Sequence, residues 1–368
     1  MLSRRQGFHP GMPIGLGPHR SSNRSALAGA QSTTAGARAA RTAAFDPPRL
    51  LRHAHVQSIL ASLGLRHWAR RRQAAAMLRA AVPEILELDG VRLLGYYSGG
   101  QGAAEARRRK LLIVLHGWEG SADSHYVVAL AGKAFAAGFE VFRLNFRDHG
   151  GTAALNEGLF HSCRLEEVAA AVREAACRYG AAETYLAGFS LGGNFALRIA
   201  AQPEAARVLT RVAAVCPVLN PASTLRALDE GLWLYRDHFL RRWRKSLAAK
   251  AAAFPELYDF GDLRRFRTLA AMTAFCVERY TGFADLDSYL HGYRLTGSVL
   301  EPLAVPAWLL AARDDPVIPS EDLGDIARSA ALEVTLLPHG GHCGFLEDFR
   351  LRSWLDGQVL DAFGAAGA

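Results

Sequence analysis

Residues 185–200 read YLAGFSLGGNFALRIA. A short apolar run leads into G-F-S-L-G at residues 188–192, and the sequence that follows is typical of a helix. A strand, a sharp turn and a helix around a G-x-S-x-G pattern predict a nucleophile elbow, in which the strained turn lifts the Ser190 hydroxyl clear of the sheet. Since the pattern also arises by chance, the rest of the chain must decide whether Ser190 is a nucleophile or a serine in a glycine-rich turn.

Short apolar runs and helix-like segments alternate on both sides of this stretch. Predicted helices occupy residues 125–137 and 165–179, and predicted strands lie at 111–115, 140–144, 184–187, 212–216, 307–311 and 334–337. This order predicts an α/β protein with a mostly parallel sheet flanked by helices. Residues 84–97 alternate in polarity around Asp89-Gly90, which predicts a hairpin. Ligands bind at the carboxyl ends of parallel strands, and the strongest motifs of this chain lie there.

Two segments depart from this alternation. Residues 1–45 are rich in Gly, Ser, Ala and Arg and lack periodicity, so we expect a disordered tail or a wrongly extended start, with a targeting peptide as the alternative. Between about residues 220 and 301, aromatic, basic and helix-like sequence replaces the strands and is too long for a loop. We therefore expect residues 46–368 to form one domain that includes a helical lid insertion at 220–301.

Charge and cysteine content limit the kinds of partner and cofactor that the sequence predicts. The net charge is +8, but residues 1–45 hold six arginines and no acid, so the remainder is near neutral and no nucleic-acid partner is predicted. The five cysteines form no C-x-x-C pair, which predicts no zinc site and fits a reducing, cytoplasmic compartment. No uncharged apolar run approaches the roughly 18 residues of a membrane span. We expect neither a metal nor an organic cofactor.

A serine nucleophile needs a base, and the base needs an acid that holds its tautomer. The segment L-L-P-H-G-G-H-C-G-F at residues 336–345 offers His342, within a glycine-rich loop, and His339, directly after Pro338. We favour His342 as the base and give His339 a structural role. The segment A-R-D-D-P at residues 312–316 offers Asp315, our choice, and Asp314; a structural turn in which Asp caps and Pro stiffens is compatible with this role.

A tetrahedral intermediate on Ser190 needs N–H donors for its oxyanion. The N–H of Leu191, directly after the nucleophile, is one candidate. The other should come from the loop H-G-W-E-G-S at residues 116–121, where the backbone N–H of Trp118 is our choice. His116 could be mistaken for a base, but we expect it to brace this loop through hydrogen bonds. The chain order of Ser190, Asp315 and His342 is that of α/β-hydrolases.

With these motifs in place, the chain resembles the YheT-like branch of the α/β-hydrolases, related to the ABHD1 and ABHD3 type. The matching segments are H-V-Q-S at residues 55–58, H-G-W-E-G-S at 116–121, N-F-R-D-H-G-G-T at 145–152 and G-F-S-L-G-G-N at 188–194. Asp315 and His342 fall in the family's D-D-P and G-G-H-x-G-F segments. The resemblance extends from about residue 45 to the C-terminus and implies the α/β-hydrolase fold.

The resemblance implies hydrolysis of carboxylic esters, of short or medium chain or of the acylglycerol type, through an acyl-enzyme on Ser190. Acyl transfer or thioester cleavage on the same residues is the alternative reaction, and a non-catalytic ligand-binding scaffold is the alternative class. Two departures stand out: Asp148 replaces a glycine found in many relatives, and residues 273–277 lack the E-F-D sequence often found in the insertion. Because of the second departure, the sequence does not define the substrate pocket. The oligomeric state is not predicted either.

Residues 232–250 of the insertion combine apolar and basic side chains. Phe239, Trp243 and Leu247 are spaced as one helical stripe, with Leu232 and Leu240 near it and arginines around it. One interpretation is a lid helix packed on the body of the protein. The other is an interfacial helix that makes peripheral contact with a membrane.

Overall fold

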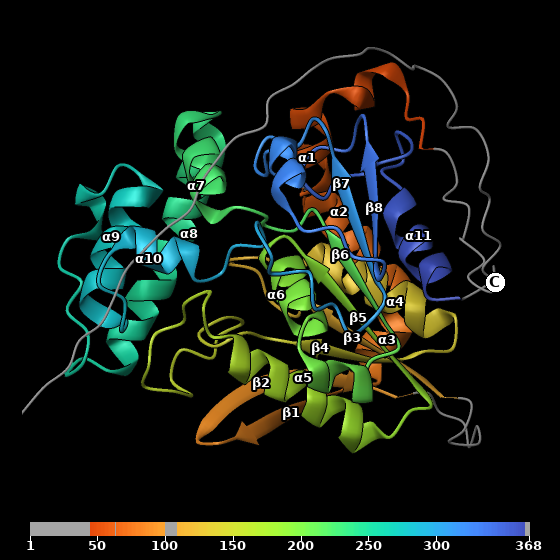
Figure 1. Ribbon diagram of the computed structural model, residues 1–368, viewed down its shortest axis with the longest axis horizontal. Coiled ribbons are helices and arrows are strands. Elements are labelled where there is room, and N and C mark those ends of the chain that lie inside the picture. Colours follow the sequence, from red (N-terminus) through yellow and green to blue (C-terminus); the bar gives the residue numbers. More distant parts are fainter. Residues whose placement is uncertain (1–44, 63, 100–108, 365–368) are drawn as a thin grey trace, which may run out of the picture. The chain divides into compact units, whose positions relative to one another are not determined.

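Eight strands of the described residues form one sheet in the order β1-β2-β4-β3-β5-β6-β7-β8 (Figure 1). The computed structural model describes residues 45–62, 64–99 and 109–364. The strands are β1 Ala81–Leu88, β2 Val91–Ser98, β3 Lys110–Leu115, β4 Glu140–Leu144, β5 Glu183–Phe189, β6 Arg211–Val215, β7 Ala307–Ala312 and β8 Leu332–Leu337. β2 pairs antiparallel with β1 and β4, and all other neighbours are parallel. The predicted mostly parallel sheet and the predicted hairpin are confirmed.

Helices cover both faces of the sheet. Alternate residues of a strand point to opposite faces, and in β3 Ile113 packs with α5 (Leu165–Tyr179) and α6 (Leu191–Ala200) in one apolar core. Val114 packs in the other core with α4 (His125–Ala136) and α11 (Trp354–Ala362). Because both faces are buried, the central strands β3 to β7 are mainly apolar, although β4 contains the buried Glu140 and Arg143. This burial explains why mainly apolar runs, rather than alternation, mark β3 to β7 in the sequence.

The first described segments pack near the end of the chain. They are the 3₁₀ turn η1 (Arg49–Arg52) and the helices α1 (Ala54–Ala61), α2 (Gly64–Gln73) and α3 (Ala75–Arg79). Except for Phe45, the predicted tail of residues 1–45 lies outside the described residues. The buried ring of Phe45 lies 5.2 Å from the ring of Trp354 and 5.8 Å from that of Phe345. The tail prediction is therefore wrong at Phe45, because this side chain belongs to the core.

Helices replace strands between β6 and β7, and Figure 1 shows them gathered to one side of the sheet. They are α7 (Pro221–Glu230), α8 (Trp233–Ala253), α9 (Leu269–Tyr280) and α10 (Leu286–His291). We call this segment, residues 220–301, the insertion. No helix in the described part of the chain is both long and apolar enough to cross a membrane.

Short 3₁₀ turns complete the described elements. They are η3 (Pro203–Arg207), η4 (Leu263–Arg265) and η5 (Ser320–Asp325). η3 follows α6 closely, so the helix after Ser190 ends before Pro203. η5 follows β7 and the loop that carries Asp314 and Asp315.

Candidate active site

Ser190 lies at the turn between β5 and α6, with a φ of 52°, a left-handed conformation that serine seldom adopts. Its N–H donates to the carbonyl of Val215 at 2.9 Å, which fixes the turn on β6. A side chain at Gly188 would lie 2.1 Å from the carbonyl oxygen of Gly192, and one at Gly192 would lie 2.5 Å from that of His116. Only glycine fits these two positions, so the strand, the turn and the helix have the geometry of a nucleophile elbow.

His342 lies within hydrogen-bond distance of this serine, and Asp315 lies within hydrogen-bond distance of His342. The Nε2 atom of His342 is 3.1 Å from the Ser190 hydroxyl oxygen, and its Nδ1 atom is 2.9 Å from Oδ2 of Asp315. Asp315 is itself held, because its Oδ1 accepts the N–H groups of Val317 at 2.8 Å and Ile318 at 3.0 Å. We call Ser190, His342 and Asp315 the triad. Their side chains come from the loops after β5, β7 and β8, at the carboxyl edge of the sheet.

The electrostatics of the triad favour a strongly basic imidazole. Burial opposes the protonation of His342, but the Asp315 carboxylate outweighs it and raises the pKa of this histidine to about 9. Only 2% of the Asp315 side chain is exposed, so water screens this attraction little. In the neutral ring, Nδ1 donates to Asp315 and Nε2 is free to accept the hydroxyl proton of Ser190.

The loop of residues 116–121, which we call the oxyanion loop, lies against the serine. A side chain at Gly117 would contact Cβ of Ser190 at 3.2 Å, so no larger residue fits there without displacement. Among the hydrogen bonds of the described residues, none is donated by the backbone N–H of Trp118 or of Leu191. Both predicted oxyanion donors are therefore available beside the serine, and Leu191 begins helix α6, whose first N–H groups lack helical partners.

His116 supports the oxyanion loop instead of serving as a base. Its Nδ1 lies 2.7 Å from the carbonyl of Gly117, and its Nε2 accepts the N–H of Phe146 at 3.1 Å. Burial lowers the pKa of His116 well below its ordinary value, so the ring stays neutral. The prediction that His116 braces the loop by hydrogen bonds is confirmed.

Asp314 and His339, the alternative candidates for the acid and the base, contact each other and the histidine loop instead of Ser190. Asp314 accepts the N–H of Gly341 at 2.9 Å, and its other oxygen is 3.7 Å from Nδ1 of His339. His339 is 36% exposed, whereas the His342 side chain is 16% exposed. Asp314 and His339 thus fix the loop that presents His342, and the structure brings neither of them to Ser190.

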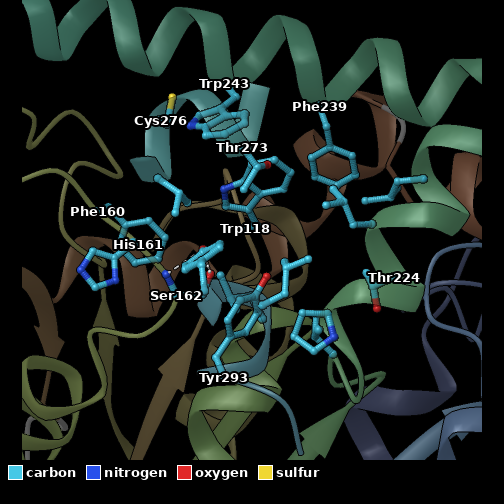
Figure 2. Close-up of a pocket in the computed structure, with 18 of the residues that line it drawn as sticks. Trp118, Phe160, His161, Ser162, Thr224, Phe239, Trp243, Thr273, Cys276 and Tyr293 are labelled. Carbon is cyan, nitrogen blue, oxygen red and sulfur yellow. Dashed lines mark hydrogen bonds between the residues drawn. The ribbon is translucent and has the colours of Figure 1, made fainter. Parts of the chain in front are cut away.

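Two pockets meet at Ser190, and both are lined by Trp118 and Phe239 as well. The first is mostly apolar and lies between the strand ends and the insertion. Figure 2 shows Phe239 and Trp243 pointing from α8 toward Trp118 in this pocket. The second pocket is more polar than the first and is lined by side chains that include Ser62, Ser124, His125, Tyr126, His238, Arg242 and His342.

Two buried polar atoms at the apolar pocket have no hydrogen-bond partner among the described residues. They are Oγ1 of Thr224 and Nδ1 of His161, and both side chains line the pocket. Burial lowers the pKa of His161 to about 4, so its ring is neutral at physiological pH. A ligand that enters the pocket would therefore meet two unpaired polar groups on an otherwise apolar wall.

One group of residues in the site could also ligate a metal. The side-chain ligand atoms of Cys216, His342 and Cys343 lie within 4.8 Å of one another. Both ring nitrogens of His342 already contact Asp315 and Ser190, so a metal bound here would compete with the triad. The prediction of a metal-free site stays a prediction.

A family model described as "alpha/beta hydrolase fold" matches residues 110–349 of this chain, which is well over half of its length. The chain belongs to the α/β hydrolase fold family. Its fold class, with a mostly parallel sheet flanked by helices, is thereby confirmed.

Individual relatives agree with this assignment. The chain is 27% identical over 345 residues to "Putative esterase YheT" of Escherichia coli (strain K12), which covers 90% of this chain and 96% of that protein. It is 26% identical over 262 residues to "Protein ABHD15" of Homo sapiens, covering 69% of this chain and 54% of that protein. The solved 2,6-dihydroxy-pseudo-oxynicotine hydrolase has a TM-score of 0.50 at 16% identity over 83% of this chain and 80% of that one, a likeness of fold. The YheT-like resemblance is confirmed, and the names support a general hydrolase.

In this α/β hydrolase, residues from the beginning of the domain support the histidine loop, a role that sequence reasoning missed. The hydroxyl of Ser58 accepts the N–H of His342 at 2.8 Å. The fully buried Gln57 donates to the carbonyl of Leu346 at 3.1 Å and accepts its N–H at 2.7 Å. The H-V-Q-S motif was the available signal, but its sequence alone does not show which distant loop it contacts.

The apolar stripe of α8 faces the hydrolase body. The rings of Phe239 and Trp243 each lie 5.2 Å from that of Trp118, and Leu240 and Leu247 are buried. This packing fits the interpretation as a lid helix, whereas peripheral membrane contact stays a prediction without this stripe to support it. Leu232, at the beginning of the helix, remains 37% exposed.

The two departures from the family pattern also have structural counterparts. Thr273 and Val277, at the segment that lacks E-F-D, line the apolar pocket. Asp148 adopts a φ of 63°, a conformation that glycine reaches without strain. Its carboxylate accepts the ammonium of Lys250 at 2.9 Å and the N–H of Phe160 at 2.7 Å. These interactions give the aspartate a function that glycine could not have.

Proposed function

We propose that this α/β hydrolase cleaves carboxylic esters through an acyl-enzyme formed on Ser190. The observation that carries the proposal is the continuous chain of contacts from the serine hydroxyl to Nε2 of His342 at 3.1 Å and from Nδ1 to Asp315 at 2.9 Å. A hydroxyl becomes a competent nucleophile when such a base takes its proton. Two N–H groups that have no acceptor among the described residues, on Trp118 and Leu191, support the same reaction.

The proposed reaction has two halves. The Ser190 oxygen attacks the ester carbonyl while Nε2 of His342 takes its proton, and the Trp118 and Leu191 N–H groups stabilise the oxyanion. His342 then protonates the departing alcohol oxygen, and the acyl-enzyme remains. Water, deprotonated by the same imidazole, attacks this ester, and the carboxylic acid leaves as Ser190 regains its proton. Asp315 keeps Nδ1 protonated and stabilises the imidazolium in both halves.

The two pockets suggest how an ester is oriented. An acyl chain needs an apolar wall, which the pocket under the insertion supplies with side chains such as Leu225, Leu228 and Trp243. The alcohol would then occupy the polar pocket, where the ring of His342 can reach its oxygen. This orientation suits short- or medium-chain esters and acylglycerol-type esters in which the glycerol keeps free hydroxyl groups.

A fluorophosphonate probe and a series of p-nitrophenyl esters from C2 to C16 test the proposal. We expect the probe to label Ser190 and the esters to be hydrolysed, with both signals absent in Ser190→Ala. Hydroxylamine or added alcohols that capture the acyl group faster than water would indicate acyl transfer instead. A folded protein that is neither labelled nor active on any ester would contradict the proposal and favour a non-catalytic binding scaffold.

A further inference from the structure

We propose that helix α8 of the insertion positions the oxyanion loop, and that Glu119 is the residue through which it does so. The inference rests on the proposed function, because it assigns positioning residues to the oxyanion donor on Trp118. It goes beyond that function by making the insertion part of the apparatus that sets the rate of the chemical step, in addition to lining the acyl pocket.

Glu119 follows Trp118 directly and is held by three separate contacts. Its N–H donates to Nε2 of His149 at 3.2 Å, and its carboxylate accepts the Ser246 hydroxyl at 2.6 Å. The guanidinium of Arg242 donates to its carbonyl oxygen. Glu119 is 6% exposed and has a φ of 55°, so its backbone occupies a conformation that such contacts must maintain. Two of the three partners belong to α8.

The contacting side chains lie on one face of α8. Residues three or four positions apart share a face of a helix, and this spacing separates Phe239, Trp243, Ser246 and Lys250. The first two pack their rings on the Trp118 side chain at 5.2 Å each, as Figure 2 shows. The same face therefore contacts the side chain of Trp118 and, one residue later, the carboxylate of Glu119.

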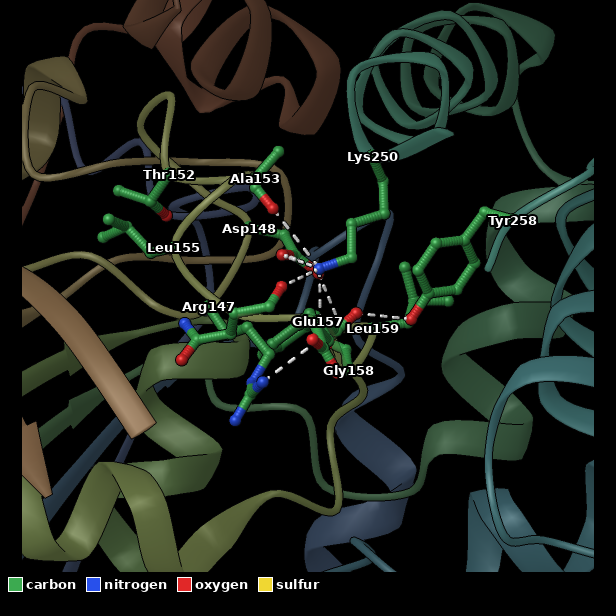
Figure 3. Close-up of polar contacts among 12 residues, drawn as sticks. Arg147, Asp148, Thr152, Ala153, Leu155, Glu157, Gly158, Leu159, Lys250 and Tyr258 are labelled. Carbon is green, nitrogen blue, oxygen red and sulfur yellow. Dashed lines mark hydrogen bonds and ion pairs between the residues drawn. The ribbon is translucent and has the colours of Figure 1, made fainter. Parts of the chain in front are cut away.

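Lys250 fixes the far end of this face. Its side chain is fully buried, and Figure 3 shows its ammonium group surrounded by oxygen atoms. It donates to Asp148 at 2.9 Å and to the carbonyls of Asn156 at 2.5 Å, Gly158 at 3.2 Å and Ala153 at 3.4 Å. Four acceptors for three ammonium hydrogens leave this lysine little freedom to leave its position.

The contacts close into a ring. Asp148 directly precedes His149, and His149 accepts the N–H of Glu119. Because Nε2 of His149 is an acceptor, Nδ1 carries the proton and donates to the carbonyl of Arg147 at 2.7 Å. From α8 the ring passes through Lys250, Asp148, His149 and Glu119 and returns to α8 at Ser246 and Arg242.

This ring has a direct consequence for the reaction. An oxyanion donor stabilises the transition state only where it points at the developing charge, and a displacement of about 1 Å can cost on the order of 100-fold in rate. The peptide N–H of Trp118 lies one residue from the clamped Glu119 backbone. Loosening Glu119 should therefore lower kcat and leave ester binding in the two pockets unchanged.

The test uses the full chain with Ser246→Ala, Glu119→Ala and the double variant. Lys245→Ala, an exposed position on the same helix, is the matched control. The readouts are kcat and KM for p-nitrophenyl butyrate, the rate of Ser190 labelling by a fluorophosphonate, and the melting temperature. We expect each single variant to lose about tenfold in kcat and in labelling rate with KM unchanged, since a donor is displaced and not removed. Lys245→Ala should match the wild type.

Two further comparisons make the result decisive. If Ser246 and Glu119 act through one hydrogen bond, the double variant should lose no more than either single variant. Glu119→Gln keeps an oxygen acceptor for Ser246 and should retain kcat, which also provides a folded reference if Glu119→Ala does not fold. An unchanged kcat, a raised KM alone, or additive losses in the double variant would overturn the inference while leaving the proposed function intact. A wild type that is not labelled at Ser190 would overturn both.

Discussion

The strand-end loops and the insertion differ in how the sequence specifies the roles of their residues. In the loops, Gly188 and Ser190 have roles that the adjacent sequence indicates, because a sharp turn tolerates only certain side chains. In the insertion, Trp243 and Lys250 gain their roles from partners more than 100 residues away, Trp118 and Asp148. The comparison teaches that the elbow can be recognised from its local sequence, whereas the contacts of the insertion depend on long-range packing.

The largest expected effect concerns the strand-end loops and tests whether Ser190 is the nucleophile. Ser190→Ala should lower kcat by about 10⁶-fold, as removal of the nucleophile does in other serine enzymes. The melting temperature should stay within a few degrees, since the turn is held by backbone contacts. Steady-state kinetics and thermal unfolding of the same preparation measure both quantities. Residual activity within a factor of ten of wild type would show that another residue is the nucleophile.

The second effect concerns the acid of the triad. Asp315→Asn should lower kcat by about 10⁴-fold, because the wrong tautomer of His342 is then favoured. In the wild type, kcat/KM should rise as the pH rises through about 9, the pKa of His342, because only the neutral imidazole takes the serine proton. Without the carboxylate the pKa of His342 falls, so the residual profile should shift to lower pH. A profile that stays in place would contradict the role of Asp315.

The third effect moves to the insertion and is measured as stability. Lys250→Met leaves the Asp148 carboxylate buried without its counter-ion, which should reduce the free energy of unfolding by about 3–5 kcal/mol. Burial raises the pKa of Asp148 and lowers that of Lys250, which shows that both charges are held against a desolvation cost. Asp148→Asn with Lys250→Met should lose less than Lys250→Met alone. Urea unfolding compares them, and equal losses would mean that the charge pair is not what fixes α8.

The smallest effect is a gain in stability. Thr224 buries a hydroxyl that has no partner among the described residues, and its side chain lines the pocket of the insertion. Thr224→Val has nearly the same shape and removes this unpaired group, so the free energy of unfolding should rise by about 1 kcal/mol. Thr273→Val is the matched control, because the Thr273 hydroxyl donates to the Leu269 carbonyl at 2.8 Å and its loss should not stabilise. A loss of stability in Thr224→Val would indicate that the hydroxyl is paired.

How far the sequence predicts this protein follows the same division. The bounds of β3 to β8 were predicted to within two residues, helped by the buried and mainly apolar sequence of β3 to β7, and the glycines around Ser190 marked the elbow. The spacing of Asp315 and His342 after late strands was enough to place them near the serine, as the distances show. Glu119 and Ser246 gave no such signal, because a charged loop residue and a helical serine are common on protein surfaces. Their pairing depends on how α8 lies on the sheet, which no local pattern states.

The contacts of Gln57 and Ser58 determine at which stage of chain synthesis the site can form. These residues bond to Leu346 and His342, which follow them by 289 and 284 positions. When β5 and the oxyanion loop have left the ribosome, the proposed nucleophile and oxyanion donors are present, but the loop that carries His342, the proposed base, has not been made. The nascent chain therefore lacks the proposed site until its last strand pairs, and loop closure over such a distance is intrinsically slow. In refolding, recovery of activity should follow the formation of helical structure.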